Sequence, residues 1–317
     1  MRYRQAGVGL VELMISLVLG LLILALAMQM FLGSRASQSS QQALSYLQES
    51  ARYVSFRLQP LMRNIGYAGC TSVQPISIAS SVDSQYRLLP SISTKKAVQD
   101  GIDYWELDWV YADKESEVPL AAAMKTSVSE LDIGADSSGV FLDKNGKVIE
   151  KIALISDCNT ADVFQIENDT IPGSRIKPDG KLSRAYGQIG SAASHVYPIK
   201  AWRLFLGEQQ GSGTTALFID RVEAVSSFKR EELVAGVSDL AISFGVDTND
   251  DGSIDQPAAT PKAVDENAWA SRIRRVEIAL TLQSDPGVVP GGANDGRLER
   301  TFTMTFTPRN LQLRGNS

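Results

Sequence analysis

One stretch of the sequence, "DTNDDGSID", places oxygen-bearing side chains at the spacing of a calcium-binding loop. Such a loop takes ligands from alternate positions, turns sharply at a glycine in position six and uses the backbone carbonyl of position seven. Gly252 stands at position six here, whereas the twelfth position, usually acidic, is Ala258. We predict a weak calcium site completed by Asp265 or Glu266, with the candidate ligands Asp247, Asn249, Asp251, Ser253 and Asp255. The alternative is an acidic, solvated turn between two strands, and no cofactor is required in either case.

A single carboxylate, that of Glu12, stands at the edge of an apolar run near the N-terminus. Residues 13–32 carry no formal charge, and a helix of this length spans roughly 30 Å, one hydrocarbon thickness of a bilayer. Arg2 and Arg4 precede the run, which favours a cytoplasmic N-terminus and an exported remainder. A charge at the centre of a membrane span costs about 2.5–3.5 kcal/mol. Glu12 is either tolerated because it lies near the helix end, or it meets a cation when subunits associate, and we favour the second interpretation.

The residues around Glu12 resemble the class III signal of type IV prepilins. In that signal a short basic leader ends in a glycine, cleavage follows it, and a glutamate is the fifth residue of the mature chain. The resemblance assigns Gly7 as the end of the leader and Val8 as the new, N-methylated N-terminus, with Glu12 fifth. Val8 and Gly9 replace the phenylalanine and threonine usual in the family. The resemblance also implies that Glu12 pairs with the N-terminal amine of a neighbouring subunit.

The helix is predicted to continue beyond the apolar run with one apolar face. Apolar residues recur at spacings of three and four, at Leu44, Leu47, Ala51, Val54 and Leu58. Pro60 is then expected to kink or end the helix. The predicted divisions are a leader (1–7), a membrane half of the helix (8–32), a periplasmic amphipathic half (33–65) and a β-rich head domain (66–317).

Four later segments alternate apolar and polar residues with a period of two, which predicts half-buried strands. They are "YWELDWVY", "LAISFGV", "RRVEIALTLQ" and "RTFTMTFTPRN". Strands with one apolar face form antiparallel sheets, and the amphipathic half of the helix is the expected cover. The predicted fold class is therefore α+β, with a long N-terminal helix on an antiparallel sheet as in pilins. We interpret the cluster Arg272, Arg274 and Arg275 as solvated charge.

The remaining candidate residues for chemistry are two cysteines, Cys70 and Cys158, and one histidine, His195. An exported domain meets an oxidising compartment, so we predict a Cys70–Cys158 disulfide. A structural zinc site needs four ligands, so two isolated cysteines do not indicate one. With a single histidine, a catalytic triad or a histidine-containing metal site would have to use His195. We interpret His195 as a packed or loop residue and predict that the chain is not an enzyme. The formal net charge of −5 also argues against a nucleic-acid partner.

The stretch "RNIGYAGC" after the predicted helix narrows the resemblance. Gly66, Tyr67, Gly69 and Cys70 match the Gly-Tyr-x-Gly-Cys of PilW-type minor pilins. The resemblance implies a structural subunit that joins other minor pilins to prime type IV pilus assembly and lies at the pilus tip. Its precursor would be a single-pass inner-membrane protein with a periplasmic C-terminal domain. The implied partners are the prepilin peptidase, the inner-membrane assembly platform, other minor pilins and the major pilin, and such pili serve twitching motility and adhesion.

Other interpretations stay open at this point. A type II secretion J-type minor pseudopilin would share the signal and the helix-plus-sheet plan. A membrane-anchored periplasmic binding or sensor protein would explain the apolar helix but neither Gly7 nor Glu12. A cleaved secretory signal would need a short apolar core before an A-x-A-like site, whereas here the helical pattern runs past residues 34–36 without a break.

Overall fold

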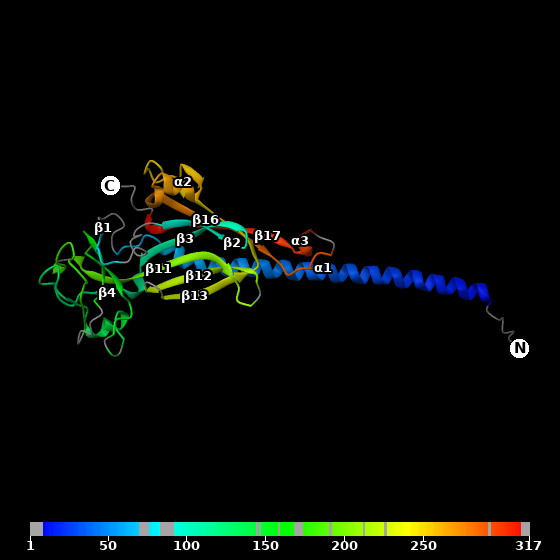
Figure 1. The fold of residues 1–317 in the computed structure, drawn as a ribbon, viewed down its shortest axis with the longest axis horizontal. Coiled ribbons are helices and arrows are strands. Elements are labelled where there is room, and N and C mark those ends of the chain that lie inside the picture. Colours follow the sequence, from blue (N-terminus) through cyan, green and yellow to red (C-terminus); the bar gives the residue numbers. More distant parts are fainter. Residues whose placement is uncertain are drawn as a thin grey trace. The chain divides into compact units, whose positions relative to one another are not determined.

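The computed structural model describes residues 9–69, 76–82, 92–143, 145, 147–157, 159–167, 174–189, 192–211, 213–224, 227–290 and 293–311. It confirms the α+β class, because one long N-terminal helix is followed by a domain rich in antiparallel strands (Figure 1). Gly7, Val8, Cys70 and Cys158 lie outside the described residues.

Helix α1 (Leu10–Asn64) joins the predicted apolar and amphipathic halves in one element of 55 residues. Its first turn carries Glu12 and its last turn Arg63, charges that suit the two ends of the helix dipole. Pro60 does not end the helix, since α1 runs through it to Asn64, close to the predicted boundary at residue 65. Pro60 is exposed while Leu61 and Met62 are buried, so packing of the last turn outweighs the hydrogen bond that proline removes.

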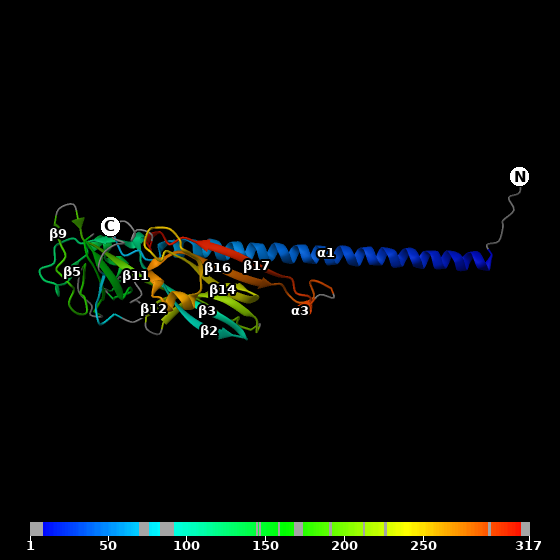
Figure 2. The same cartoon turned by 90° about the horizontal axis from the view of Figure 1, so that it is seen from above.

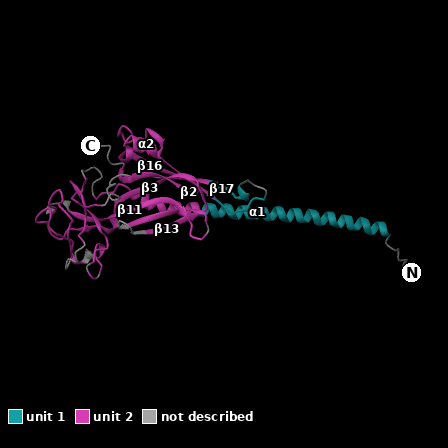
Figure 3. Ribbon diagram, viewed as in Figure 1, with its two compact units in different colours: residues 1–49, 283–300 teal, residues 50–282, 301–317 magenta. Residues whose placement is uncertain are grey.

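The chain divides into two compact units, coloured separately in Figure 3. Unit 1 consists of residues 1–49 and 283–300, and unit 2 of residues 50–282 and 301–317. The segment 283–300 thus belongs with the first part of α1, although the sequence placed it in the head domain. Within this segment Ser284 N donates to Leu298 O at 2.8 Å and Gly287 N to Asp295 O at 2.7 Å, which closes a loop that contains the short helix α3 (Ala293–Gly296).

The larger sheet of unit 2 has nine strands. One path through the sheet has the order β1-β7-β6-β11-β12-β13. In addition, β3 and β4 pair with β11, and β2 pairs with β3. Figure 2 shows β2, β3, β11 and β12 side by side. Its strands are β1 (Ile76–Ile78), β2 (Ile92–Gln99), β3 (Ile102–Ala112), β4 (Val118–Pro119), β6 (Ile152–Ser156), β7 (Ala161–Gln165), β11 (His195–Glu208), β12 (Thr215–Ala224) and β13 (Ser227–Ala235). One pair departs from the antiparallel prediction, because β1 and β7 are parallel.

A second sheet has the order β15-β14-β16-β17. Its strands are β14 (Val237–Val246), β15 (Gln256–Ala259), β16 (Ile273–Gln283) and β17 (Glu299–Phe306), and β5 (Leu131–Asp132) with β8 (Arg175–Ile176) and β9 (Gln188–Ile189) with β10 (Ala192–Ala193) form two small ladders. The connection from β14 to β16 is more than a hairpin, since it holds β15, helix α2 (Pro261–Glu266) and the 3-10 helix η4 (Trp269–Arg272). Two further 3-10 helices are η2 (Lys114–Ser116) and η3 (Ala135–Val140).

The four strand segments predicted from alternation are confirmed as β3, β14, β16 and β17. Their inward residues are buried, including Leu107, Phe244, Ile278 and Met304. In unit 2 the end of α1 buries Ala51, Val54, Leu58, Leu61, Met62 and Ile65, which recur at helical spacing. The amphipathic face therefore packs into the core from Ala51 onward, as the sequence predicted.

Candidate functional site

The first half of α1 exposes apolar side chains that nothing in the described part of the chain covers. Its most apolar 18-residue window has a mean hydropathy of 2.7 and none of it is buried. Leu10 is 75% exposed and Met30 79%. At the end of this region the Arg35 guanidinium lies 4.9 Å from the Phe31 ring centroid, a pairing that suits a membrane–water boundary. In length and composition this half of α1 fits a single-pass membrane anchor.

Glu12 lies in the first turn of this apolar helix with its side chain exposed. The turn is closed by Glu12 N, which donates to Gly9 O at 3.0 Å, and Ser16 Oγ donates to Glu12 O at 2.7 Å. Within the described residues no side chain pairs with the Glu12 carboxylate. The carboxylate is therefore available to a cation from outside this chain, and its pairing with a neighbouring subunit stays a prediction.

The acidic loop after β14 adopts the turn that a calcium loop requires. Asp247 is fully buried, and its Oδ2 accepts from Gly252 N at 2.9 Å, so the first position is tied to the sixth. Gly252 has a φ of +91°, which only glycine adopts without strain. Asp247 Oδ1 is buried and has no hydrogen-bond partner among the described residues. At the other end, Asp255 Oδ2 accepts from the Thr248 amide and hydroxyl, each at 2.8 Å.

Arg274 is buried beside this loop, which corrects the interpretation of that residue, one of the cluster Arg272, Arg274 and Arg275, as solvated charge. The Arg274 side chain is only 3% exposed, and its Nη2 lies 3.0 Å from Asp247 Oδ2. Its Nη1 donates to the backbone carbonyl of Leu311. Arg272 Nη2 lies 3.1 Å from Asp250 Oδ2, and Arg275 Nη2 donates to Pro257 O at 2.6 Å.

These contacts bear on the predicted calcium site. The described residues contain no group of three histidine, cysteine, aspartate or glutamate side chains arranged to hold a metal ion. Desolvation raises the pKa of Asp247, but the Gly252 amide and Arg274 outweigh it and hold that pKa below its usual range. Asp265, one proposed completing ligand, accepts instead from Thr94 Oγ1 at 3.3 Å. Calcium binding stays a prediction. A calcium ion in this loop would have to bind beside the positive charge of Arg274, which already pairs with Asp247.

Comparison with known families gives a match at the N-terminus. The family described as prokaryotic N-terminal methylation motif matches residues 2–28, which include Glu12 and most of the apolar run. The matched residues include the start of the long, uncovered apolar helix described above. Together they indicate a type IV pilin-like protein. Comparison with the curated proteins and with the solved structures found no match.

In this pilin-like chain residues 66–69 follow the end of α1 and contact the sheet. Gly66 and Gly69 have φ values of +78° and +82°, so each needs glycine at a turn. Tyr67 O accepts from Ala112 N at 2.8 Å, and the Tyr67 ring meets that of Tyr197 edge-on at 5.9 Å. The stretch thereby joins the end of the helix to β3 and β11.

The neighbours of the two cysteines approach one another closely. A Cβ added to Gly69 would lie 2.8 Å from Ser156 Cβ, so the backbone before Cys70 and the chain just before Cys158 are almost in contact. This proximity supports the predicted Cys70–Cys158 disulfide. Because both cysteines lie outside the described residues, the disulfide itself stays a prediction.

An ion pair that the sequence analysis missed fixes α1 to the larger sheet. Arg57 donates to Glu231 on β13 through Nε at 3.0 Å and Nη2 at 2.7 Å, and Tyr53 Oη lies 3.3 Å from the same carboxylate. The Arg57 hydrogen bonds lower the pKa of Glu231. The Arg57 guanidinium also lies 5.8 Å from the Trp202 ring centroid. No local pattern in the sequence indicates this pair, because its two residues are 174 positions apart.

His195, at the start of β11, is partly exposed. Its Nε2 lies 4.0 Å from Glu117 Oε1, and its ring lies 6.4 Å from that of Tyr197. Both contacts are ordinary packing at a strand end, which agrees with the interpretation drawn from the sequence.

Proposed function

We propose that this chain is a PilW-type minor pilin that joins other minor pilins, primes type IV pilus assembly and lies at the fibre tip. The observation that carries the proposal is the uncovered apolar half of α1 with Glu12 in its first turn. A helix of this kind needs lipid around it before assembly, and apolar neighbours around it once it leaves the membrane. A subunit of a helical filament has both environments.

Glu12 gives the proposed assembly its register. A desolvated carboxylate and a desolvated amine each carry a large penalty alone, and pairing offsets much of it. The amine is the N-terminus of a neighbouring subunit, exposed when the prepilin peptidase cleaves after Gly7 and leaves Val8 to be methylated. The inner-membrane assembly platform and the major pilin complete the set of partners. The protein first spans the inner membrane once, with its sheet-rich domain in the periplasm.

A J-type minor pseudopilin of type II secretion is the second candidate. The match over residues 2–28 and the long helix favour both candidates equally. The match of Gly66, Tyr67, Gly69 and Cys70 to the PilW-type stretch favours the pilus. A membrane-anchored binding or sensor protein would use neither the methylation motif nor Glu12.

The test is N-terminal sequencing of the protein from membranes and from sheared fibres. We expect a methylated Val8 at the start of the mature chain, and uncleaved precursor when Gly7 is replaced by a bulky residue. A chain that keeps Met1, or begins near Ser37, would remove the pilin assignment. Deletion of the gene separates the two candidates, because a minor pilin lowers surface piliation whereas a pseudopilin lowers protein secretion.

A further inference from the structure

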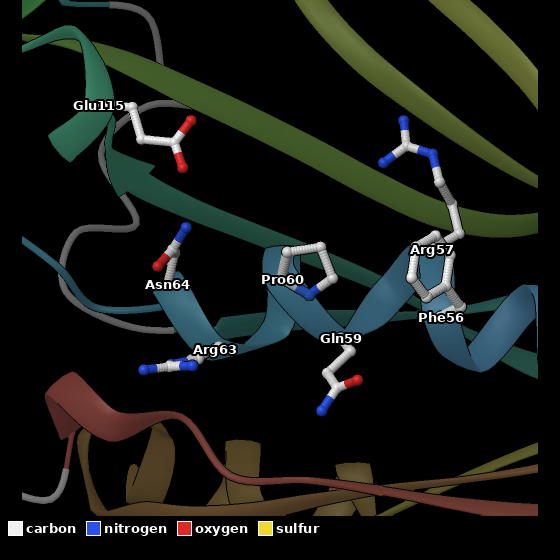
Figure 4. Close-up of a pocket in the computed structure, with 7 residues that line it drawn as sticks. All are labelled: Phe56, Arg57, Gln59, Pro60, Arg63, Asn64 and Glu115. Carbon is white, nitrogen blue, oxygen red and sulfur yellow. The ribbon is translucent and has the colours of Figure 1, made fainter.

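The last turns of α1 are flanked by two grooves in unit 2. The first has a volume of about 680 Å³ and lies between α1 and η2 (Figure 4). It is lined by Phe56, Arg57, Gln59, Pro60, Arg63, Asn64 and Glu115. The second, of about 200 Å³, lies between α1 and the end of β17 and is lined by Gln59, Arg63, Thr305, Phe306, Thr307 and Arg309. Gln59 and Arg63 line both, so the two grooves meet on one face of the helix.

The second groove is rich in hydrogen-bond donors and contains two cations. Among the described residues, Arg63 and Arg309 form no ion pair, whereas Arg57 is held by Glu231. Thr305, Thr307 and Gln59 add polar groups, and no carboxylate lines this groove. Two guanidinium groups at one small pocket are complementary to a carboxylate, which guanidinium can bind through two parallel hydrogen bonds. In a chain with a net charge of −5, this is a local reversal of sign.

The first groove adds apolar contact and a helix carbonyl whose usual i+4 donor is absent. Phe56 is 75% exposed, so its ring offers an apolar surface at the rim of this groove. Pro60 has no N–H, so the Phe56 carbonyl lacks the donor that an α-helix would place four residues later. A peptide bound in this groove would pack an apolar side chain on Phe56 and Pro60 and point a backbone N–H toward the Phe56 carbonyl.

We propose that the two grooves form one docking site for an acidic segment of another pilin-like subunit. A carboxylate of the segment binds between Arg63 and Arg309, and an adjacent apolar residue packs on Phe56 and Pro60. The identity of the partner rests on the proposed function, and the chemistry rests on the grooves. A lipid headgroup is a poor occupant, because about 31 helical residues, roughly 45 Å of helix, separate Leu32 from Arg63. Glu115 in the adjoining groove disfavours a polyanion such as nucleic acid.

The test is a site-specific photo-cross-link in cells that make the full chain. Gln59 lines both grooves, so we place p-benzoylphenylalanine there and identify the cross-linked peptide by mass spectrometry. We expect a peptide from another pilin-like subunit with an aspartate or glutamate beside an apolar residue. The double variant R63E/R309E should lower the cross-link yield at least about fivefold, since two exposed ion pairs become repulsive. Replacing the mapped acidic residue by lysine should restore it.

The matched control is K95E/K181E, which makes the same change of charge at two exposed lysines away from both grooves and should leave the yield unchanged. R63Q/R309Q, which only removes the charges, keeps the test valid if the reversal impairs folding. The docking site is overturned by no cross-link, by an unchanged yield in R63E/R309E, or by equal losses in the control. A cross-link to lipid, to nucleic acid, to residues 312–317 of the same chain, or to a segment without a carboxylate overturns it as well. Leader cleavage and piliation, measured in the same cells, report separately on the proposed function.

Discussion

Removing the Arg274 side chain tests how the acidic loop is held. In the variant R274M, Asp247 keeps only the Gly252 amide as a donor to its Oδ2 and stays fully buried. Breaking a buried ion pair from one side costs about 3–5 kcal/mol, because the remaining charge is desolvated without compensation. The Leu311 carbonyl also loses its donor. We therefore expect R274M to lower the free energy of unfolding by about 3–5 kcal/mol.

The same loop supplies a matched control. Arg272 and Asp250 form an ion pair whose side chains are 38% and 44% exposed, and an exposed pair of this kind contributes at most about 1 kcal/mol. R272M should therefore cost much less than R274M. The double variant D247N/R274M should recover most of the loss, since no uncompensated charge remains.

The assay is urea unfolding of the full chain in detergent micelles, followed by tryptophan fluorescence. Trp109 is fully buried, so its emission reports on unfolding of unit 2. A loss below about 1 kcal/mol for R274M, or a loss equal to that of R272M, would refute the argument that the Asp247–Arg274 pair is desolvated.

Loss of Arg274 changes the pH dependence of stability. In the wild type the pKa of Asp247 lies below its ordinary value of 3.8, so its contribution is complete above that pH and is lost as pH falls through the lower folded value. In R274M the guanidinium no longer lowers the pKa of Asp247 while burial still raises it, so that pKa lies above its wild-type value and less stability is lost on acidification. The stability difference between the proteins should therefore shrink below about pH 4.

The remaining predictions concern the membrane helix, the calcium loop and one glycine. Glu12→Ala should still insert and be cleaved but should be missing from minor-pilin complexes isolated by affinity purification; normal complexes would show that Glu12 is only tolerated. About 5 mM calcium should stabilise the wild type by about 1 kcal/mol if the dissociation constant is near 1 mM, a shift of about 2 °C in Tm by calorimetry. An equal shift in Asp251→Ala would contradict a calcium site. Gly69→Ala should cost about 2–4 kcal/mol in urea unfolding because of the close approach to Ser156, whereas Gly101→Ala, at nearly the same φ but in open space, should cost about 1 kcal/mol.

The elements with a local signal could be predicted from the sequence. The apolar run and the buried face from Ala51 to Leu58 gave α1, because helical spacing is read over a few neighbouring residues. The period of two gave β3, β14, β16 and β17 for the same reason. The effect of Pro60 could not be predicted, because proline favours a helix end and only the burial of Leu61 and Met62 shows why the helix continues.

The charges of the site could not be predicted in this way. Arg274 looks like a surface residue until Asp247, 27 positions away, is brought beside it. Arg57 and Glu231 are separated by 174 positions, and no local pattern connects them. The parallel pairing of β1 with β7 also depends on the path of the chain between them. For Glu12 the limit is different, because its predicted partner belongs to another subunit.

The end of α1 is tied to residues near the opposite end of the sequence. Asn310 Nδ2 lies 3.4–3.5 Å from the carbonyls of Arg63, Asn64 and Ile65, across a sequence separation of 245 to 247 positions. These carbonyls are among those that a helix leaves without an internal donor. During synthesis α1 is made well before Asn310, which follows the end of the helix by about 245 residues. The C-terminal end of α1 can therefore be capped only after the strands between them have been made, and closing so long a loop makes this a late step of folding.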